Sequence, residues 1–295
     1  MLIWTSFSIY HELTSQKDLP GAFDQMKDAA AKPLSAIYLV IAVCMMPLNW
    51  LLETLEWYLL LNRDIGISFR KCMAAVLGGL ALSMNTPNRV GEYFGRILYL
   101  EKGKRLLGAN YSVLSGLSQL LMTLTAGLIA LQILPLWYPV AFPFKDMLGV
   151  LFSPFSRLIL LFVVLTILFF YFNYASVFLF LSKKLPLKIL SSLRTQFAPL
   201  EINLLFRILS ISLMRFMIFT TQYLLIWKAL GINFDIMQGA AIVSIIYLIM
   251  AIIPTIAFAE LGIRGKVALW VAGLYTNQVM AVATGTVFIW LINLM

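Results

Sequence analysis

Two segments carry the side chains that could do chemistry, and each combines proline, glycine, glutamate and arginine. They are Asn85–Arg96 and Pro254–Lys266. In each, a glutamate precedes an arginine by four residues, so on a helix the two side chains share a face and can form an ion pair. The pairs are Glu92 with Arg96 and Glu260 with Arg264. Because the planar guanidinium offers parallel donors to phosphate oxygens, both segments are candidate sites for an anionic group.

The candidate binding residues include more cations than these two pairs. The predicted headgroup-binding set is Arg89, Glu92, Arg96, Arg215, Glu260, Arg264 and Lys266. Glycines allow close backbone approach, and helix N-termini that follow proline add anion-binding amides. The predicted hinges are Pro87, Gly91, Gly95, Pro254, Gly262 and Gly265. The alternative interpretation is that the two ion pairs only pin hairpins and cap helices near an interface.

Two further carboxylates, Glu53 and Glu56, lie three residues apart inside an apolar run. Such a pair could do acid–base chemistry, or it could balance basic residues in a polar groove. The sequence contains no metal-ligand cluster, no nucleophile elbow and no phosphate loop, and His11 is its one histidine. We therefore expect no metal, no cofactor and no catalytic residue.

The composition indicates what surrounds these residues. Of 295 residues, 61% are hydrophobic and 12% are charged, whereas a soluble domain needs about 25% charged residues. Lipid therefore replaces water around much of the chain. The net charge of +9 is then explained by basic cytoplasmic loops, so we expect no nucleic-acid partner.

Apolar runs of about 20 residues predict the membrane spans. We predict an all-α, polytopic bundle with spans near 34–61, 106–134, 157–181, 204–230 and 267–295. Residues 1–33 are expected to hold a truncated first span and an interfacial segment, and residues 34–295 the transmembrane domain. Two shorter apolar stretches end in proline, glycine and charge, which predicts re-entrant or broken-helix hairpins near 72–100 and 239–266.

Loop charges favour the hairpin interpretation. If residues 72–100 return to the side they left, twelve basic residues share one face and four lie opposite. The twelve are Arg63, Arg70, Lys71, Arg89, Arg96, Lys102, Lys104, Arg105, Lys183, Lys184, Lys188 and Arg194. The positive-inside rule makes this face cytoplasmic, which also predicts a cytoplasmic C-terminus. Each half then has a span, a hairpin and a span of opposite entry, as in an inverted repeat.

At the two motifs the sequence resembles the lysylphosphatidylglycerol synthetase transmembrane-region family. Asn85–Arg96 is similar to the first signature of that family, and Pro254–Lys266 is similar to the second, where a proline precedes a Leu-Gly-x-Arg turn. The resemblance covers roughly residues 34–295. It implies a flippase-like helical fold and, as substrate, a lipid or polyprenyl lipid. The sequence has no aminoacyl-transferase domain, so aminoacylation of lipid is not implied for it.

The sequence therefore predicts a multi-pass protein of the plasma or inner membrane that binds a lipid headgroup and moves it between leaflets, rather than an enzyme. Two alternatives remain open. One is a membrane-embedded enzyme acting on lipid-linked sugars, with Glu53 or Glu56 as base, and the other is an anchor for a separate lipid synthase. The expected partners are a membrane lipid and either a second copy of the chain or a lipid-modifying enzyme.

Overall fold

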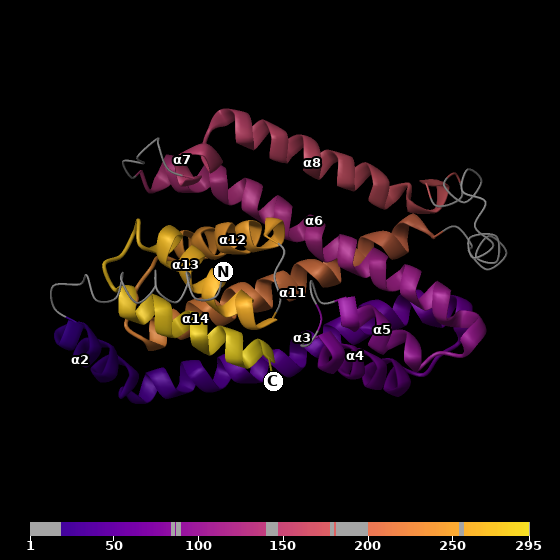
Figure 1. The fold of residues 1–295 in the computed structure, drawn as a ribbon, viewed down its shortest axis with the longest axis horizontal. Helices are drawn as coiled ribbons and strands as arrows, with labels where there is room; N and C mark the ends of the chain where they lie inside the picture. The colour runs from indigo at the N-terminus through magenta and orange to yellow at the C-terminus, as the bar shows by residue number, and fades with distance from the viewer. Residues whose placement is uncertain are drawn as a thin grey trace. The chain divides into compact units, whose positions relative to one another are not determined.

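The computed structural model describes residues 19–83, 86, 90–139, 147–177, 180, 200–253 and 257–294. Within these ranges the chain is helical and contains no β-strand (Figure 1). The predicted all-α helical architecture is therefore confirmed. The helices are α2 (Leu19–Ala30), α3 (Pro33–Ile65), α4 (Phe69–Ser83), α5 (Val90–Leu98), the 3-10 turn η2 (Lys102–Lys104), α6 (Arg105–Trp137), α7 (Met147–Leu151), α8 (Pro154–Phe172), α11 (Ile202–Ala229), α12 (Ile236–Ile252), α13 (Ala257–Ala272) and α14 (Val279–Leu294).

The chain divides into two compact units, each assembled from segments that are distant in sequence. Unit 1 comprises Met1–Leu48, Thr123–Ile159 and Met217–Met295, and unit 2 comprises Asn49–Met122 and Leu160–Phe216. Unit 1 therefore holds α12, α13 and α14, whereas unit 2 holds α4 and α5. The long helices α3, α6 and α11 each contribute residues to both units.

Four helices are long and apolar enough to cross a membrane, among the residues that the structure describes. They are α3, η2 with α6, α8 and α11. At 1.5 Å per residue, the 33 residues of α3 extend about 50 Å, well beyond the roughly 30 Å of a hydrocarbon core. Helices α3, η2 with α6, and α11 coincide with the predicted spans near 34–61, 106–134 and 204–230. Helix α8 ends at Phe172, short of the predicted end of the span near 157–181, and residues 178, 179 and 181 lie outside the described part.

The most apolar of these helices, α8, shows why composition pointed to lipid. Its side chains at Leu158, Phe162, Leu165 and Phe169 are all large, apolar and exposed. In water such a stripe would be an interaction site or an aggregation hazard. On a helix long enough to span, the same stripe faces acyl chains, so the described helices make up a membrane-embedded protein.

The last predicted span is wrong in its bounds, because no single helix covers 267–295. Helix α13 ends at Ala272, and α14 begins only at Val279. Between them Gly273 and Tyr275 close turns on the carbonyls of Leu269 and Ala272. The intervening residues include Thr276, whose hydroxyl accepts a hydrogen bond from the Gln278 backbone at 3.2 Å. Glycine and small polar side chains favour such local bonds over a continued helix.

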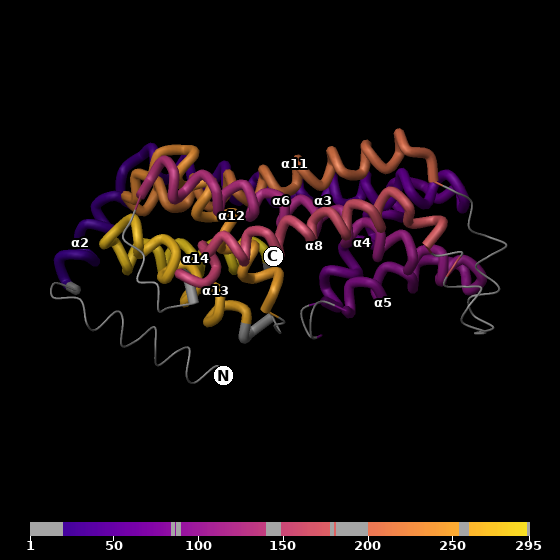
Figure 2. The backbone as a smooth tube through the Cα atoms, turned by 90° about the horizontal axis from the view of Figure 1, so that it is seen from above, coloured from indigo at the N-terminus to yellow at the C-terminus, as the bar shows by residue number. Residues whose placement is uncertain are grey.

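The predicted hairpin near 72–100 consists of α4 and α5, which lie side by side (Figures 1 and 2). The hydroxyl of Thr86 accepts a 2.7 Å hydrogen bond from the Gly91 backbone and so caps the start of α5. The two helices touch through glycine, since a Cβ at Gly95 would lie 2.6 Å from the Cα of Gly79. The hairpin therefore depends on backbone-to-backbone packing.

The predicted hairpin near 239–266 corresponds to α12 and α13, which pack against each other, while α13 also packs against α14. Asp235 caps α12 by accepting a hydrogen bond from the Met237 backbone at 3.2 Å. Helix α12 is buried on almost every side, as expected for a helix that is apolar all round. Its preceding turn uses Gly231 at φ +90°, a left-handed conformation that ends α11.

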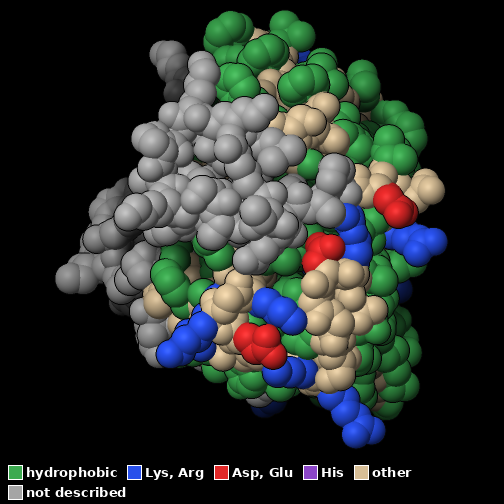
Figure 3. All heavy atoms as spheres, turned by 90° about the vertical axis from the view of Figure 1, so that its right-hand side faces the viewer, with side chains coloured by type: hydrophobic (Ala, Val, Ile, Leu, Met, Phe, Trp, Pro, Cys, Tyr) green, Lys and Arg blue, Asp and Glu red, His purple; other side chains and the backbone are tan. Residues whose placement is uncertain are grey.

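One end of unit 2 carries several exposed basic side chains among the residues that the structure describes. Arg63, Arg70, Lys71 and Lys102 are exposed there, and the ammonium of Lys104 binds the Ile65 carbonyl at 3.5 Å. Figure 3 shows lysine and arginine side chains gathered on this face. Arg96 is a correction to the predicted set of twelve, because it is buried and adds no surface charge. Arg89, Lys183, Lys184, Lys188 and Arg194 lie outside the described residues.

Candidate functional site

A cluster of buried charges occupies unit 2, and we call it the unit 2 charge cluster. It consists of Glu53, Glu56, Glu92, Arg96 and Arg215. Both Glu53 and Arg96 are less than 5% exposed, and Glu56 is fully buried. Ionised groups at such burial are stable only when paired and hydrogen-bonded. The buried charges of this cluster therefore need one another as partners, and the contacts between them decide whether the site is stable.

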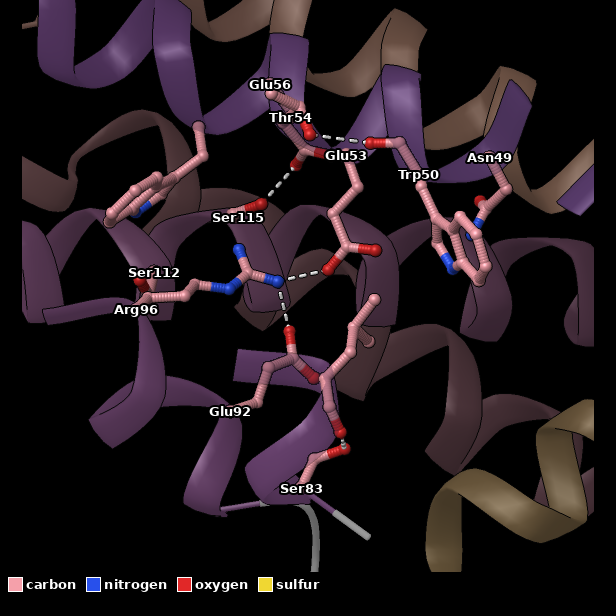
Figure 4. A network of polar contacts seen from close by, with 12 residues as sticks. Asn49, Trp50, Glu53, Thr54, Glu56, Ser83, Glu92, Arg96, Ser112 and Ser115 are labelled. Carbon is pink, nitrogen blue, oxygen red and sulfur yellow. Dashed lines mark hydrogen bonds and ion pairs between the residues drawn. The ribbon is translucent and has the colours of Figure 1, made fainter. Parts of the chain in front are cut away.

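Arg96 joins the hairpin to α3. Its Nη2 donates to Glu53 on α3 and to Glu92 on α5, as Figure 4 shows. The guanidinium also lies 5.9 Å from the centre of the Trp57 ring, within the range of a cation–π contact. Glu92 is the most accessible of these groups, with 21% of its side chain exposed. The predicted Glu92–Arg96 pair is therefore present, but it belongs to a larger network.

Arg215 connects the same carboxylates to α11. Its guanidinium lies 2.8 Å from the Glu53 carboxylate and 3.1 Å from that of Glu56. Its Nε donates to the side-chain oxygen of Asn49 at 3.2 Å. Arg215 thus bridges three positions of α3, which explains how a deeply placed arginine of an apolar helix is accommodated.

Glu56 receives a full set of donors. Ser115 and Ser118 of α6 donate to Oε1 at 2.7 and 2.8 Å, and Ser212 of α11 donates at 3.1 Å. Arg215 donates to the other oxygen. These four donors satisfy the hydrogen-bonding capacity of the buried carboxylate. Charge-assisted bonds of this kind are roughly twice as strong as neutral ones.

Helical spacing brings these residues together. Asn49, Glu53 and Glu56 recur at intervals of four and three, so they share one face of α3. Ser115 and Ser118 recur in the same way on α6, and Ser212 and Arg215 do so on α11. The three faces meet with α5 in unit 2. Sequence reasoning missed Asn49 and the three serines, although their helical periodicity against the glutamates was a usable signal.

Unit 1 contains the second predicted pair, and it is built differently. Arg264 on α13 is 8% exposed, and its Nη2 donates to Glu260 one turn earlier. Its guanidinium lies 5.8 Å from the Tyr247 ring of α12. Its Nε and Nη1 make no well-formed hydrogen bond among the described residues, although the Tyr223 hydroxyl of α11 lies against the guanidinium. A buried donor left unmet costs about 1–3 kcal/mol, so this arginine is less completely satisfied than Arg215.

Lys266 lies two residues beyond Arg264 and is also buried. Its ammonium lies 4.9 Å from the centre of the Trp270 ring. With Glu260, these two cations give the segment a formal charge of +1, whereas the unit 2 charge cluster has three carboxylates for two guanidiniums. The two sites therefore have opposite formal charge.

The structure places the predicted hinge glycines within helices. Gly91 and Gly95 lie in α5, where a Cβ would meet backbone atoms of α4. Gly262 and Gly265 lie inside α13 and not at a break. Pro87 and Pro254 lie outside the described residues, as does Arg89 of the predicted binding set. Within the described ranges, no three histidine, cysteine, aspartate or glutamate side chains gather as a metal site would require.

Comparison with known proteins gives a family. The family model described as the lysylphosphatidylglycerol synthase TM region matches residues 28–293, essentially the whole chain. The predicted resemblance is therefore confirmed. Neither the curated proteins nor the solved structures contain a match.

Proposed function

The chain belongs to the lysylphosphatidylglycerol synthase transmembrane-region family, and from that premise we propose that it binds a lipid headgroup and moves the lipid between leaflets. The observation that carries the proposal is the unit 2 charge cluster. Charged side chains within membrane helices are costly, and they usually mark substrate or ion pathways. Here five of them meet from α3, α5 and α11.

The exchangeable member of the cluster is Glu92, because it is the most exposed and it is held by Arg96. A lipid phosphate takes its place on the guanidinium, since phosphate and carboxylate both offer paired oxygens to arginine. Arg96 also keeps a buried Nε with no partner among the described residues. Once Glu92 has left, two carboxylates remain with two guanidiniums. The cluster is then formally neutral when it accepts the anion.

The surroundings of Glu56 support binding over proton abstraction. Four donors surround this buried carboxylate. A general base must reach the proton that it removes and must be able to take it up. The four donors already occupy the oxygens of Glu56 and separate them from any substrate, so we assign Glu56 to holding Arg215 and not to the chemistry of a lipid-linked sugar.

Orientation forms part of the proposal. The exposed basic end of unit 2 faces the cytoplasm, in keeping with the positive-inside bias of Arg63, Arg70 and Lys71. The predicted cytoplasmic C-terminus is kept as a separate part of the proposal. Labelling of single introduced cysteines in intact cells tests this: a residue near Lys102 labelled from outside contradicts it.

Lipid exchange in proteoliposomes tests the function. Purified chain is reconstituted with fluorescent phosphatidylglycerol or phosphatidylcholine, and a membrane-impermeant reductant reports how much probe reaches the outer leaflet. We expect wild-type chain to accelerate exchange, and Arg96→Gln and Glu92→Gln to slow it. The matched control is Glu101→Gln, which removes an exposed carboxylate that pairs with Lys104 at 3.7 Å. Exchange at the protein-free rate with every probe would refute the proposal.

A further inference from the structure

The α4–α5 hairpin has an end that the unit 2 charge cluster does not use. Helices α4 and α5 run antiparallel, because a Cβ at Gly91 would meet the Leu82 carbonyl at 2.4 Å and one at Gly95 would meet the Cα of Gly79 at 2.6 Å. The first turn of α4 therefore lies at the same end of the hairpin as the last turn of α5 and the turn η2 that follows it (Figures 1 and 2). Two basic segments of the chain thus meet at one place.

Three cations at this end have no carboxylate partner among the described residues. They are Arg70 and Lys71 of α4 and Lys102 of η2, and all three are exposed. They belong to the face on which Figure 3 shows lysine and arginine side chains. The three side chains therefore present uncompensated positive charge at the surface of unit 2.

The acidic residues of unit 2 are already engaged elsewhere. By sequence, this unit has three of them outside the unit 2 charge cluster. The Asp64 carboxylate lies 3.4 Å from Arg63, and the Glu101 carboxylate lies 3.7 Å from Lys104. The third, Glu201, is exposed just before α11 and forms no ion pair with a described residue. An anion from outside this unit is therefore needed to complement the three cations.

An apolar stripe on α5 leads away from the basic end. Val90, Phe94 and Leu98 follow one another at intervals of one helical turn, and they are 44%, 61% and 59% exposed. At 1.5 Å per residue the stripe extends about 12 Å, comparable with the roughly 15 Å of hydrocarbon in one leaflet. The stripe thus has the length and character of a surface that contacts an acyl chain.

An anionic phospholipid fits both parts of this surface. Lysine and arginine beside an apolar helix face are typical of the zone where headgroups meet acyl chains, and such cations attract anionic lipids. A zwitterionic lipid would cover the stripe but bring no net charge to the cations. An acidic soluble protein would neutralise the cations and leave the stripe without an apolar partner.

We propose that this end of the hairpin is a peripheral binding site for one anionic phospholipid. Arg70, Lys71 and Lys102 hold the headgroup, and the acyl chain lies along the α5 stripe from Leu98 toward Val90. The site is separate from Arg96, which is buried. The inference goes beyond the proposed function, because the lipid binds here whether or not it crosses the membrane.

Site-specific photo-crosslinking tests the inference in a bilayer. The photoreactive residue p-benzoylphenylalanine replaces Phe94, and the full chain is reconstituted in vesicles of equal dioleoylphosphatidylglycerol and dioleoylphosphatidylcholine. Mass spectrometry counts the adducts of each lipid after illumination. We expect phosphatidylglycerol adducts to exceed phosphatidylcholine adducts about tenfold. The matched control places the same probe at Phe162, which is 71% exposed on the apolar helix α8, and there the ratio should be near one.

Charge variants identify the cations that set this ratio. The triple variant Arg70→Gln, Lys71→Gln, Lys102→Gln should lower the ratio at Phe94 to about one, because its cations are removed. Its control removes the same charge from three exposed lysines of unit 1 and should leave the ratio unchanged. These substitutions are Lys27→Gln, Lys32→Gln and Lys228→Gln. If the triple variant does not reconstitute, raising the salt concentration around the otherwise unaltered chain should lower the ratio instead, since salt screens exposed charges.

The contrary outcomes are distinct from failure of the proposed function. A ratio near one at Phe94, an equal ratio at Phe162, or a ratio that neither the triple variant nor salt changes would overturn the site. Adducts to a second copy of the chain in place of lipid would also overturn it and identify an interface between copies. Absence of leaflet exchange together with the expected ratio would refute transport and leave the site intact.

Discussion

The two Glu-x-x-x-Arg pairs have the same spacing and similar burial, but they differ in what surrounds them. In unit 2, Arg96 shares its carboxylates with Arg215, and serines from α6 and α11 complete the network. In unit 1, Arg264 has one carboxylate and an aromatic neighbour, and two of its nitrogens make no well-formed hydrogen bond among the described residues. The spacing guarantees the pair, whereas the neighbouring helices decide how many further charged and polar partners the pair has.

The largest difference between the units should follow from replacing one carboxylate in each. Glu56→Gln removes one of the two carboxylates that pair with Arg215 and the charge that accepts three serine hydroxyls in the buried interior of unit 2, so we expect a loss of about 3–5 kcal/mol in the free energy of unfolding. Glu260→Gln removes one contact of a partly exposed group, with an expected loss of about 1–3 kcal/mol. Denaturant unfolding in detergent micelles measures both. Equal losses would contradict the difference between a carboxylate shared by several helices and one paired within a single helix.

Glycine substitutions test whether the helices of unit 2 approach each other more closely, backbone to backbone, than the helices of unit 1. In Gly95→Ala the new Cβ meets the Cα of Gly79 at 2.6 Å, and backbone cannot yield, so we expect destabilisation of about 1–3 kcal/mol. In Gly239→Ala of unit 1 the Cβ meets the end of the Leu224 side chain at 2.5 Å, which can rotate away. The loss should be smaller. Thermal unfolding compares the two, and Gly103→Ala, which has open space around it, is the control.

Serine substitutions sharpen the comparison at a smaller scale. Ser212→Ala removes a donor to Glu56 and a 2.6 Å contact with Ser118, and should cost about 1–2 kcal/mol. Ser244→Ala removes only a 2.7 Å bond to the Ala240 carbonyl of the same helix, and should cost less than about 0.5 kcal/mol. Chemical unfolding of the two variants checks this. A larger effect at Ser244 would place the critical polar network in unit 1.

The smallest effect concerns an exposed contact of unit 1. The hydroxyl of Tyr138 donates to Asp235 at 2.7 Å, and this bond holds the pKa of Asp235 below its usual value. A depressed pKa means that the stabilisation is present at neutral pH and is lost as the pH falls through the depressed value. In Tyr138→Phe the loss should begin at a higher pH. Hydrogen exchange at the Met237 amide across an acidic pH series reports the change, and identical profiles would contradict it.

The sequence by itself determined that the protein lies in lipid, which family it belongs to and which glutamate and arginine side chains pair within one helix. Lipid as solvent follows from 61% hydrophobic and 12% charged residues, because apolar surface on this scale cannot face water. The i,i+4 pairs follow from helical geometry alone, and both are present as predicted. Long apolar runs also located α3, α6 and α11 closely. Local rules fail at the end of the chain, where six residues after Ala272 interrupt the predicted last span.

Only the tertiary structure decided which charges meet. Glu56 and Ser212 are separated by 156 positions in the chain, yet they share a hydrogen bond, and no periodicity within one helix reveals that contact. Arg96 looked like a loop cation by the charge rule, and packing of α5 against α4 buries it instead. The physical reason is that burial and charge balance are properties of several helices together. Spacing along one helix fixes only which side chains share a face.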